Sequence, residues 1–301
     1  MALGDYKMSM LDFRRVIGSI VSFGFAPLLL CAKPVSVDEI FTKTSQFKIL
    51  GNLSYINIHH SQLDVVQIPQ QNSSVISVPI HSKLHQDYLN FSLQARYGIM
   101  KRVEIFSTLN AFWQQSLFEI NHSFSTQQRA DFNSFALGFI IQAKQEGKFP
   151  ALLLGGSADV ANKTYLSQTQ NMWQYGKGYS AFALSFYTID SLVFLLQANA
   201  RFNLPQDFEN IHFNLADMYS LSPMVYFAIN PFVSINAGVR YQYSTRAYAN
   251  DRIQAQSSSV GYIFGVAYEI KSRLILFASA ESFKSAFYSS DTLSLMLSYR
   301  I

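Results

Sequence analysis

The sequence has a single cysteine, only two tryptophans and few charged residues. One cysteine cannot form a disulfide within the chain, which excludes a disulfide-stabilised secreted domain and a multi-cysteine metal site. Charged residues make up 14% of the chain, against roughly 25% in an average soluble protein. The net charge of +4 comes without a basic stripe, so no nucleic-acid partner is indicated.

The chain also lacks an apolar run long enough for a membrane-spanning helix, which needs roughly 20 residues. The longest run, VIGSIVSFGFAPLLLCA, extends from Val16 to Ala32 and follows two arginines. A basic start, an apolar centre and small or polar residues at the exit are typical of a secretory signal peptide. We therefore expect a cleaved signal peptide at residues 1–32 and a short periplasmic segment at residues 33–46. A lipid-modified Cys31 and an uncleaved anchor are the alternatives.

From residue 47 onward, apolar and polar side chains alternate. LNFSLQARYGI (89–99), LVFLLQANARFNL (192–204) and FVSINAGVRYQYS (232–244) each have one apolar face and one polar face that includes an arginine. Successive side chains of a strand point to opposite sides, so this alternation predicts strands with one oily and one wet face. No helical stripe is present between Phe47 and Ile301, which predicts an all-β fold.

Twelve such segments are expected, and the spacers between them are alternately short and long. The segments cover approximately residues 47–59, 86–100, 103–115, 132–145, 149–160, 178–189, 191–203, 218–229, 232–246, 256–270, 273–284 and 291–301. The long polar loops are expected at about 60–85, 116–131, 161–177, 204–217, 247–255 and 285–290. Each segment reaches the roughly 9–11 residues with which a tilted strand crosses a bilayer.

This rhythm predicts a transmembrane up-and-down antiparallel β-barrel of about twelve strands at residues 47–301, in the outer membrane of a Gram-negative bacterium. The apolar faces would contact lipid and the polar faces a lumen, and the barrel must close because lipid leaves edge backbone groups unbonded. Fourteen strands are the alternative, if residues 60–85 add a spanning hairpin. Pro69 and Pro79 in this segment favour an extracellular extension instead.

The final segment, TLSLMLSYRI, places Leu295, Leu297, Tyr299 and Ile301 on its apolar face. An alternating, apolar last strand resembles the assembly signal of Gram-negative outer-membrane proteins. This resemblance implies that the barrel-assembly machinery is a partner, along with outer-membrane lipid and lipopolysaccharide. The chain departs from the usual pattern by ending in Ile301 rather than Phe, which predicts weaker recognition.

The segment SLQARYGIMKRVEIFSTL (92–109) resembles the strand–turn–strand motif of the MetA-pathway phenol-degradation family of outer-membrane barrels. Tyr97-Gly98 closes one strand, a short basic turn follows, and Val103-Glu104-Ile105 opens the next; LSYR near the end is also similar. The resemblance implies a transporter-like barrel for hydrophobic compounds.

Seven charged residues are expected to face the lumen. They are Arg96, Glu104, Arg201, Arg240, Glu269, Glu281 and Arg300. They would form either a charged constriction that selects solutes by sign or a set of internal salt bridges that stabilises the barrel. Phe106 and Phe112 are expected to line a path for an aromatic solute or to fill the lumen.

Four histidines, His59, His60, His81 and His85, are close to the first long loop. They are metal-site candidates, but without a supporting carboxylate pattern we expect solvated loop histidines, no metal and no cofactor. Enzymatic motifs such as G-x-S-x-G and H-E-x-x-H are absent, and His122 and His212 have no evident partner. The sequence thus favours a non-enzymatic channel for passive uptake of small solutes, anionic or aromatic. A closed adhesin or structural barrel is the first alternative and a barrel-embedded hydrolase the second.

Overall fold

The structure is a computed structural model, and it describes residues 41–60, 64–69, 75–80, 85–120, 123–165, 171–208, 211–249, 252–285 and 288–301. Across these ranges every regular element is a β-strand. No helix in the described part of the chain has the length and apolarity to cross a membrane. The expectation of an all-β fold is therefore confirmed.

The strands follow one another with short intervening segments. They are β1 (Phe47–His60), β2 (Asp64–Pro69), β3 (Val75–Ile80), β4 (His85–Met100), β5 (Val103–Ile120), β6 (Ser123–Lys144), β7 (Ala151–Tyr165), β8 (Asn171–Gln174), β9 (Gly178–Ile189), β10 (Leu192–Asn203), β11 (Gln206–Phe208), β12 (Ile211–Asn214), β13 (Met218–Ala228), β14 (Val233–Ser244), β15 (Ala247–Ala249), β16 (Arg252–Gln254), β17 (Ser257–Lys271), β18 (Leu274–Ser285) and β19 (Tyr288–Arg300).

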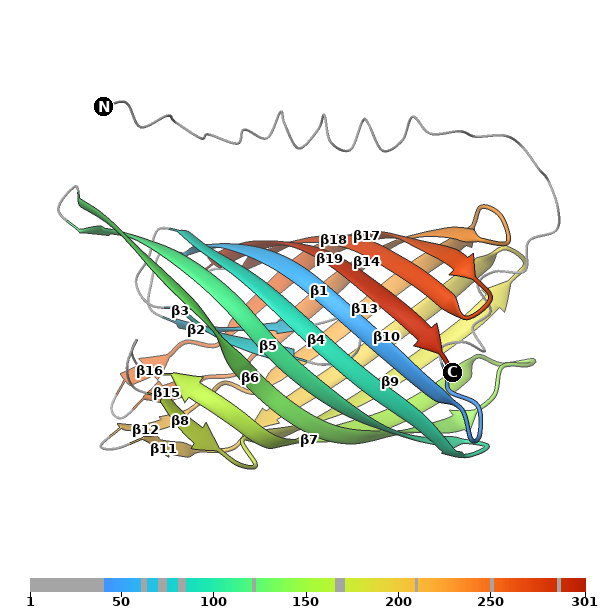
Figure 1. Ribbon diagram of the computed structural model, residues 1–301, viewed down its shortest axis with the longest axis horizontal. Helices are drawn as coiled ribbons and strands as arrows, with labels where there is room; N and C mark the ends of the chain where they lie inside the picture. Colours follow the sequence, from blue (N-terminus) through green and yellow to red (C-terminus); the bar gives the residue numbers. More distant parts are fainter. Residues whose placement is uncertain are drawn as a thin grey trace, which may run out of the picture. The chain divides into compact units, whose positions relative to one another are not determined.

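Twelve of these strands form one closed antiparallel barrel (Figure 1). The order around the wall is β6-β5-β4-β1-β19-β18-β17-β14-β13-β10-β9-β7, and pairing of β6 with β7 closes the circle. The first and last strands are neighbours, with Lys48 opposite Arg300. The short strand β8 pairs only with the end of β7 and is not part of the wall. All twelve predicted segments are strands of this barrel.

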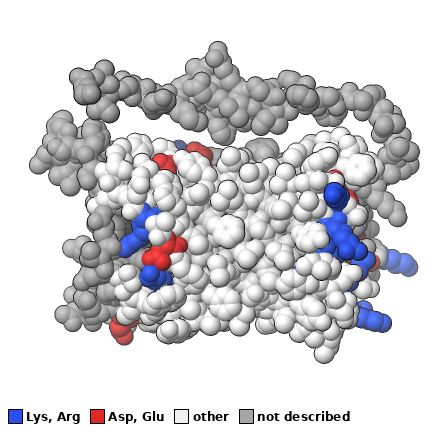
Figure 2. Space-filling model, viewed as in Figure 1, with Lys and Arg blue, Asp and Glu red and all other residues white. Residues whose placement is uncertain are grey.

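The apolar faces of the strands point outward and the polar faces inward. On β10, Phe194 and Leu196 are 44% and 45% exposed, whereas Gln197 and Arg201 are only 5% and 7% exposed. A soluble barrel would show the opposite pattern, because water rather than lipid would surround it. In Figure 2 the charged side chains gather at the two ends of the visible face and leave an uncharged band between them. This band has the character of a membrane-spanning surface.

The two ends of the barrel differ in their connections. At one end, here called the turn end, the strands are joined by tight turns such as 101–102 and 190–191. At the other, the loop end, the connections after β1, β7, β10 and β14 are long. The pattern of short and long spacers was predicted from the sequence.

At the loop end, the predicted loops at 116–131, 204–217 and 247–255 are wrong in detail. Residues 116–131 are almost entirely strand, because β5 and β6 continue to residues 120 and 123 and pair along their whole length. The predicted loops at 204–217 and 247–255 contain β11, β12, β15 and β16, which form a separate four-stranded sheet. The amide of Gln128 donates to Gln115 at 3.3 Å across β5 and β6. Strand pairing therefore continues into a region where the side chains are polar and the outer face no longer needs to be apolar.

The segment between β1 and β4 contains the hairpin β2–β3, which forms its own two-stranded sheet. It contributes no strand to the barrel wall. The prediction of twelve strands with an extension in this segment, rather than fourteen spanning strands, is confirmed.

Candidate solute pathway

The inner wall of the barrel carries a belt of uncharged polar side chains. Asn52, Ser92, Asn110, Ser134 and Asn162 lie opposite one another on five successive strands, from β1 through β4, β5 and β6 to β7. The Asn110 amide donates to the Ser134 hydroxyl at 2.9 Å. Most of the described lumen wall therefore offers amide and hydroxyl groups rather than net charge.

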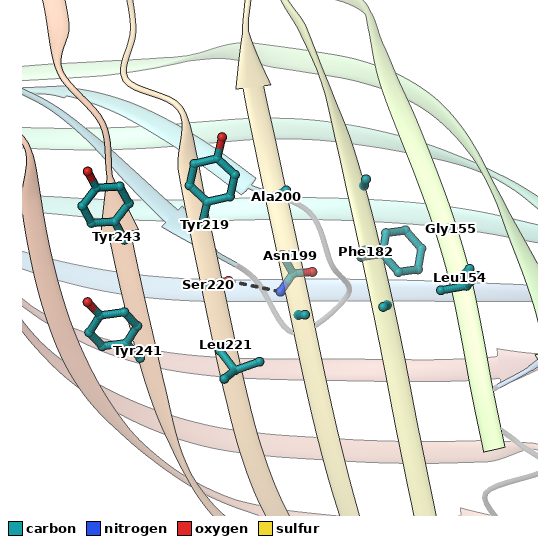
Figure 3. Close-up of a pocket in the computed structure, with 13 residues that line it drawn as sticks. Leu154, Gly155, Phe182, Asn199, Ala200, Tyr219, Ser220, Leu221, Tyr241 and Tyr243 are labelled. Carbon is teal, nitrogen blue, oxygen red and sulfur yellow. Dashed lines mark hydrogen bonds between the residues drawn. The ribbon is translucent and has the colours of Figure 1, made fainter. Parts of the chain in front are cut away.

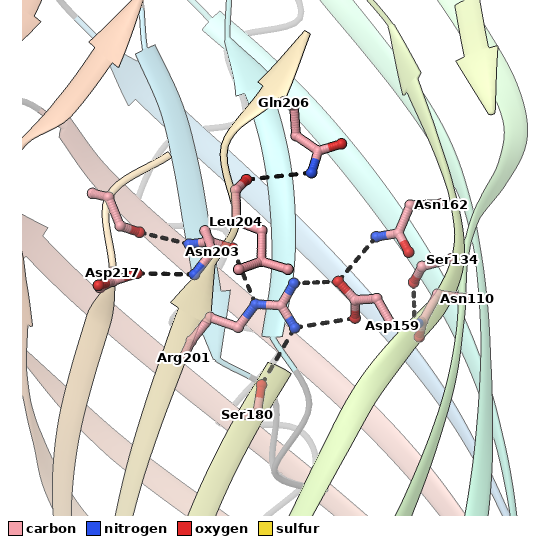
Figure 4. Close-up of polar contacts among 11 residues, drawn as sticks. Asn110, Ser134, Asp159, Asn162, Ser180, Arg201, Asn203, Leu204, Gln206 and Asp217 are labelled. Carbon is pink, nitrogen blue, oxygen red and sulfur yellow. Dashed lines mark hydrogen bonds and ion pairs between the residues drawn. The ribbon is translucent and has the colours of Figure 1, made fainter. Parts of the chain in front are cut away.

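Several charged residues of the lumen wall form close pairs. One buried pair joins Arg201 on β10 to Asp159 on β7 (Figure 4). The guanidinium donates to both carboxylate oxygens, and its Nε donates to Asn203 at 3.1 Å. Ser180 on β9 and Asn162 also contact the pair. Arg201 was predicted to face the lumen, but its partner Asp159 was missed. Counting alternate positions along β7 from the inward Leu153 would have placed Asp159 on the inner face.

Two further pairs join residues that the sequence had placed in the lumen. Arg96 contacts Glu104 at 3.3 Å, and the Glu104 side chain is fully buried. Arg240 Nη1 donates to both oxygens of Glu281 at 2.8 Å. Among the described residues these pairs have the geometry of internal salt bridges, one of the two predicted alternatives. The other two candidates, Glu269 and Arg300, are half-buried near the turn end of β17 and β19.

A second cation lies beside the Arg201–Asp159 pair. Lys177, in the connection that precedes β9, is buried, and this burial lowers the pKa of its ammonium from 10.5 to about 8. Asp159 acts in the opposite direction, and the positive charge of Arg201 lowers the pKa further. The loop end of the lumen thus holds an ammonium group that titrates close to neutral pH.

On the side formed by β5, β6, β7, β9 and β10, the turn end of the lumen is apolar. Phe41, Phe106, Ile140, Ala151, Leu153, Phe182, Phe186, Val193 and Leu195 form one buried cluster, called here the apolar floor, with Leu184, Met224 and Tyr226 packed against it. Phe106 was predicted to face the lumen. Its ring lies 6.4 Å from that of Phe182, between centroids. The other predicted aromatic residue, Phe112, lies outside this cluster and stacks on Tyr88 at 5.3 Å.

The Phe106 ring lies over a glycine. A Cβ added to Gly138 on β6 would come within 2.3 Å of Cζ of Phe106, closer than two carbons can approach. Any larger residue at position 138 would displace the ring into the lumen. The glycine therefore lets an aromatic side chain lie flat on the wall of the barrel.

The chain just before β1 is part of this floor. The Phe41 side chain packs in the cluster, and the backbone N–H of Thr42 donates to Glu104 at 2.7 Å. Ser45 N–H donates to the carbonyl of Gly98 at 2.8 Å, and a Cβ on Gly98 would lie 2.2 Å from the carbonyl oxygen of Lys43. Residues 41–46 thus pack against the inner wall at the Arg96, Gly98 and Glu104 positions of the motif at 92–109.

A groove of about 600 Å³ lies on the outside of the wall, over β7, β9, β10, β13 and β14 (Figure 3). Paired alanines, Ala181 opposite Ala200 and Ala183 opposite Ala198, form its floor. Its largest lining side chains, such as Tyr219, Leu221 and Tyr241, belong to the outward, exposed faces of their strands. The groove therefore faces the membrane and is not part of the lumen.

The predicted assembly residues also face outward. Leu295, Leu297, Tyr299 and Ile301 are all exposed on the membrane-facing side of the last strand. Their recognition by the assembly machinery stays a prediction.

The structure brings together two of the four candidate histidines. His59 and His85 are direct neighbours across β1 and β4, with 2.9 Å between their Nδ1 atoms. His81 lies outside the described residues, as does the side chain of His60. Within the described ranges no group of three or more metal-ligating side chains is present.

Of the two histidines considered for catalysis, His122 lies outside the described residues. His212 is exposed and contacts Asp207 at 2.5 Å. A contact between a histidine and a carboxylate is by itself no support for the hydrolase alternative, which needs a nucleophile as well.

Neither a family model nor a curated protein matches this sequence. Solved structures do. An outer membrane channel of the COG4313 group from Pseudomonas putida F1 has a TM-score of 0.59 and 11% identity, covering 92% of this chain and 100% of the other. The translocator domain of the autotransporter NalP from Neisseria meningitidis has a TM-score of 0.53 and 8% identity, with coverages of 89% and 92%. The fold is thus that of an outer-membrane β-barrel, a class that resides in the outer membrane of Gram-negative bacteria.

Proposed function

We propose that this protein is an outer-membrane channel for the passive uptake of small, uncharged solutes with an aromatic or aliphatic part. The observation that carries the proposal is the apolar floor, which lies at the turn end of a lumen that also carries a belt of amides and hydroxyls. A wholly polar solute must leave its hydrogen-bond partners to pass the floor, which is costly. A solute with apolar surface replaces water there without that cost. The structurally similar protein from P. putida is itself described as a channel.

The paired charges favour uncharged solutes over anions. Arg96, Arg201 and Arg240 each have a carboxylate partner within 4 Å, which lowers the net charge that a passing ion meets at these positions. Sign selectivity requires an excess of one charge along the path. Asp159 adds a negative charge to the predicted lumen set, and a preference for anions should come from buried cations such as Lys177 and Lys48.

The membrane topology belongs to the same proposal. We place the turn end in the periplasm and the loop end outside the cell, with residues 1–32 as a cleaved signal peptide and residues 33–46 in the periplasmic part of the chain. Residues 1–40 lie outside the described part of the structure. Lipopolysaccharide and the assembly machinery remain the expected partners.

The proposal is tested by comparing the flux of three small solutes into liposomes that hold the folded protein. Benzyl alcohol, benzoate and glucose differ in charge and apolar surface. We expect flux in the order benzyl alcohol, benzoate, glucose, corrected for leak through protein-free liposomes. Planar bilayers should show discrete current steps with the same protein.

The Phe41→Ala variant sharpens the test because it removes a ring from the apolar floor while leaving the barrel wall unchanged. It should raise conductance and reduce the discrimination between benzyl alcohol and glucose. Phe194→Ala, on the membrane-facing side, is the matched control and should change neither. Absence of both current steps and solute flux would overturn the channel.

A closed barrel that displays its loops is the second candidate, because the loop end is more structured than a simple pore requires. The sheet β11-β12-β15-β16 stands on this end, and β5 and β6 pair as far as Ile120 and Ser123. An adhesin would keep binding to host or cell surfaces when flux is abolished. Removal of residues 206–214, which contribute β11 and β12, should impair such binding and leave flux intact.

A further inference from the structure

The two histidines at the loop end of β1 and β4 converge on one point. His59 and His85 are paired directly across the strands, and the pairing continues regularly through Asn57 and Asp87. Their rings are perpendicular, with centroids 4.9 Å apart, and their Nδ1 atoms are 2.9 Å apart. Both side chains are exposed, so the two nitrogens are accessible from the medium.

This arrangement is suited to a metal ion. Two nitrogens that each lie about 2.0–2.1 Å from one metal, at close to a right angle, are about 2.9 Å apart. Near-right angles occur in tetragonal sites, the geometry that Cu²⁺ and Ni²⁺ prefer with imidazole ligands. A tetrahedral ion such as Zn²⁺ would need the nitrogens somewhat further apart. In the metal-free protein this spacing is that of a hydrogen bond between the two rings, which an ion would replace, and the preference for copper or nickel over zinc comes from the affinity order of nitrogen ligands.

The backbone fixes both ligands before any ion arrives. Each histidine is on a strand of the closed barrel, and the ladder between β1 and β4 sets the distance between them. Binding therefore costs little conformational entropy compared with binding by loop histidines. Asp87, two residues from His85, is held on the same side of β4 by Tyr55 and Asn57, at 2.5 and 2.7 Å. Its negative charge favours a cation close by.

We propose that His59 and His85 form a binding site for one divalent transition-metal ion, Cu²⁺ or Ni²⁺ in preference to Zn²⁺. The two Nδ1 atoms supply two ligands, and water or small anions supply the rest. The ion joins the ends of β1 and β4, which flank the long connection at residues 61–84. This site is independent of the solute pathway, because both side chains point away from the lumen.

In the test, the untagged, folded protein in detergent is titrated with NiCl₂, CuCl₂ or ZnCl₂, and isothermal calorimetry measures the binding. We expect one ion per chain, tighter binding of Ni²⁺ and Cu²⁺ than of Zn²⁺, and weaker binding as protons compete at acid pH. His59→Asn and His85→Asn should each weaken Ni²⁺ binding at least tenfold. The double variant should bind Ni²⁺ about as weakly as the weaker-binding single variant, because the one imidazole that remains in a single variant cannot chelate the ion.

His212→Asn is the matched control, since His212 is exposed at the same end of the barrel. It should bind Ni²⁺ as the unchanged protein does. Heat-modifiable migration on gels checks that every variant is folded. Absence of Ni²⁺ binding up to 1 mM in the folded, unchanged protein, or equal binding by the His59 and His85 variants, would overturn the site.

Discussion

On strands β5, β6, β7, β9 and β10 the inner wall is apolar towards the turn end and mainly polar towards the loop end, although the same alternating strands form both. At the turn end Phe106, Phe182 and Phe41 pack into the apolar floor. Towards the loop end the inner positions hold amides, hydroxyls and the Arg201–Asp159 pair. The lipid fixes only the outer face of each strand as apolar, so the inner face is free to change along the barrel axis. Selectivity can thus come from the apolar floor on this side of the turn end and from charge pairs, Arg201–Asp159 near the loop end and Arg96–Glu104 beside the floor.

The largest effect is expected from breaking the charge pair near the loop end. Asp159→Asn leaves Arg201 and Lys177 together without the shared carboxylate. Removing one partner of a buried pair typically costs about 3–5 kcal/mol. We expect a loss of this size in the free energy of unfolding, measured by urea titration of the barrel in vesicles.

The double variant Asp159→Asn, Arg201→Gln is the control for this prediction and should recover part of the loss. If Asp159→Asn lowered the free energy of unfolding by less than about 1 kcal/mol, as is typical of exposed pairs, water would have to solvate the pair fully.

A smaller effect should separate the two faces of one strand. Leu196→Lys puts a charge on the membrane-facing side of β10 and should cost about 2–4 kcal/mol near the middle of the bilayer. Gln197→Lys puts the same charge on the lumen side and should cost much less. Urea unfolding of the two variants makes the comparison directly. Equal costs would contradict the inverted arrangement of the barrel.

Because of Lys177, we expect the free energy of unfolding and the anion preference to depend on pH, and residues at the turn end should not contribute to this dependence. Its pKa is about 8 in the folded protein and 10.5 ordinarily, so the unfolded chain binds more protons between these values. The free energy of unfolding should therefore rise with pH from about 8 to about 10.5, by on the order of 3 kcal/mol. Anion preference in flux assays should fall as pH rises through about 8, because the lumen loses a positive charge.

The Lys177→Gln variant should remove both of these pH dependences. Phe106→Ala, at the turn end, should leave them in place. If the Lys177→Gln protein kept the full pH response, another group would be responsible.

The smallest effect concerns assembly rather than the lumen. Ile301→Phe restores the aromatic end expected of an outer-membrane assembly signal. Ile301 is exposed on the outer face, so the free energy of unfolding should change by less than about 0.5 kcal/mol. The fraction of protein assembled in cells, read as heat-modifiable migration, should rise. An unchanged fraction would mean that Ile301 is recognised as well as Phe.

Much of the fold was predictable because apolar and polar side chains alternate along every barrel strand. Alternation located all twelve barrel strands and placed Arg96, Arg201, Arg240, Glu104 and Glu281 in the lumen. This alternation weakens beyond the membrane, where pairing no longer requires an apolar outer face. The extension of β5 and β6 and the sheet formed by β11, β12, β15 and β16 were therefore read as loops.

The candidate site was less predictable, because alternation gives the side of the wall that a residue faces and not which inward residues of nearby strands meet. Asp159 became visible as the partner of Arg201 only when β7 and β10 were seen on either side of β9. Phe41 lies outside the strands altogether, so no periodicity marks it. The approach of the Lys43 carbonyl to Gly98 likewise depends on where the preceding chain packs.

The sequence by itself determined that this chain is a barrel with apolar side chains towards lipid, since a two-residue period and segment length suffice to specify an outward face. Only the tertiary structure decided which charges pair, what forms the apolar floor and that His59 meets His85. Those contacts join residues far apart in the chain, and strand register and closure of the barrel set their distances.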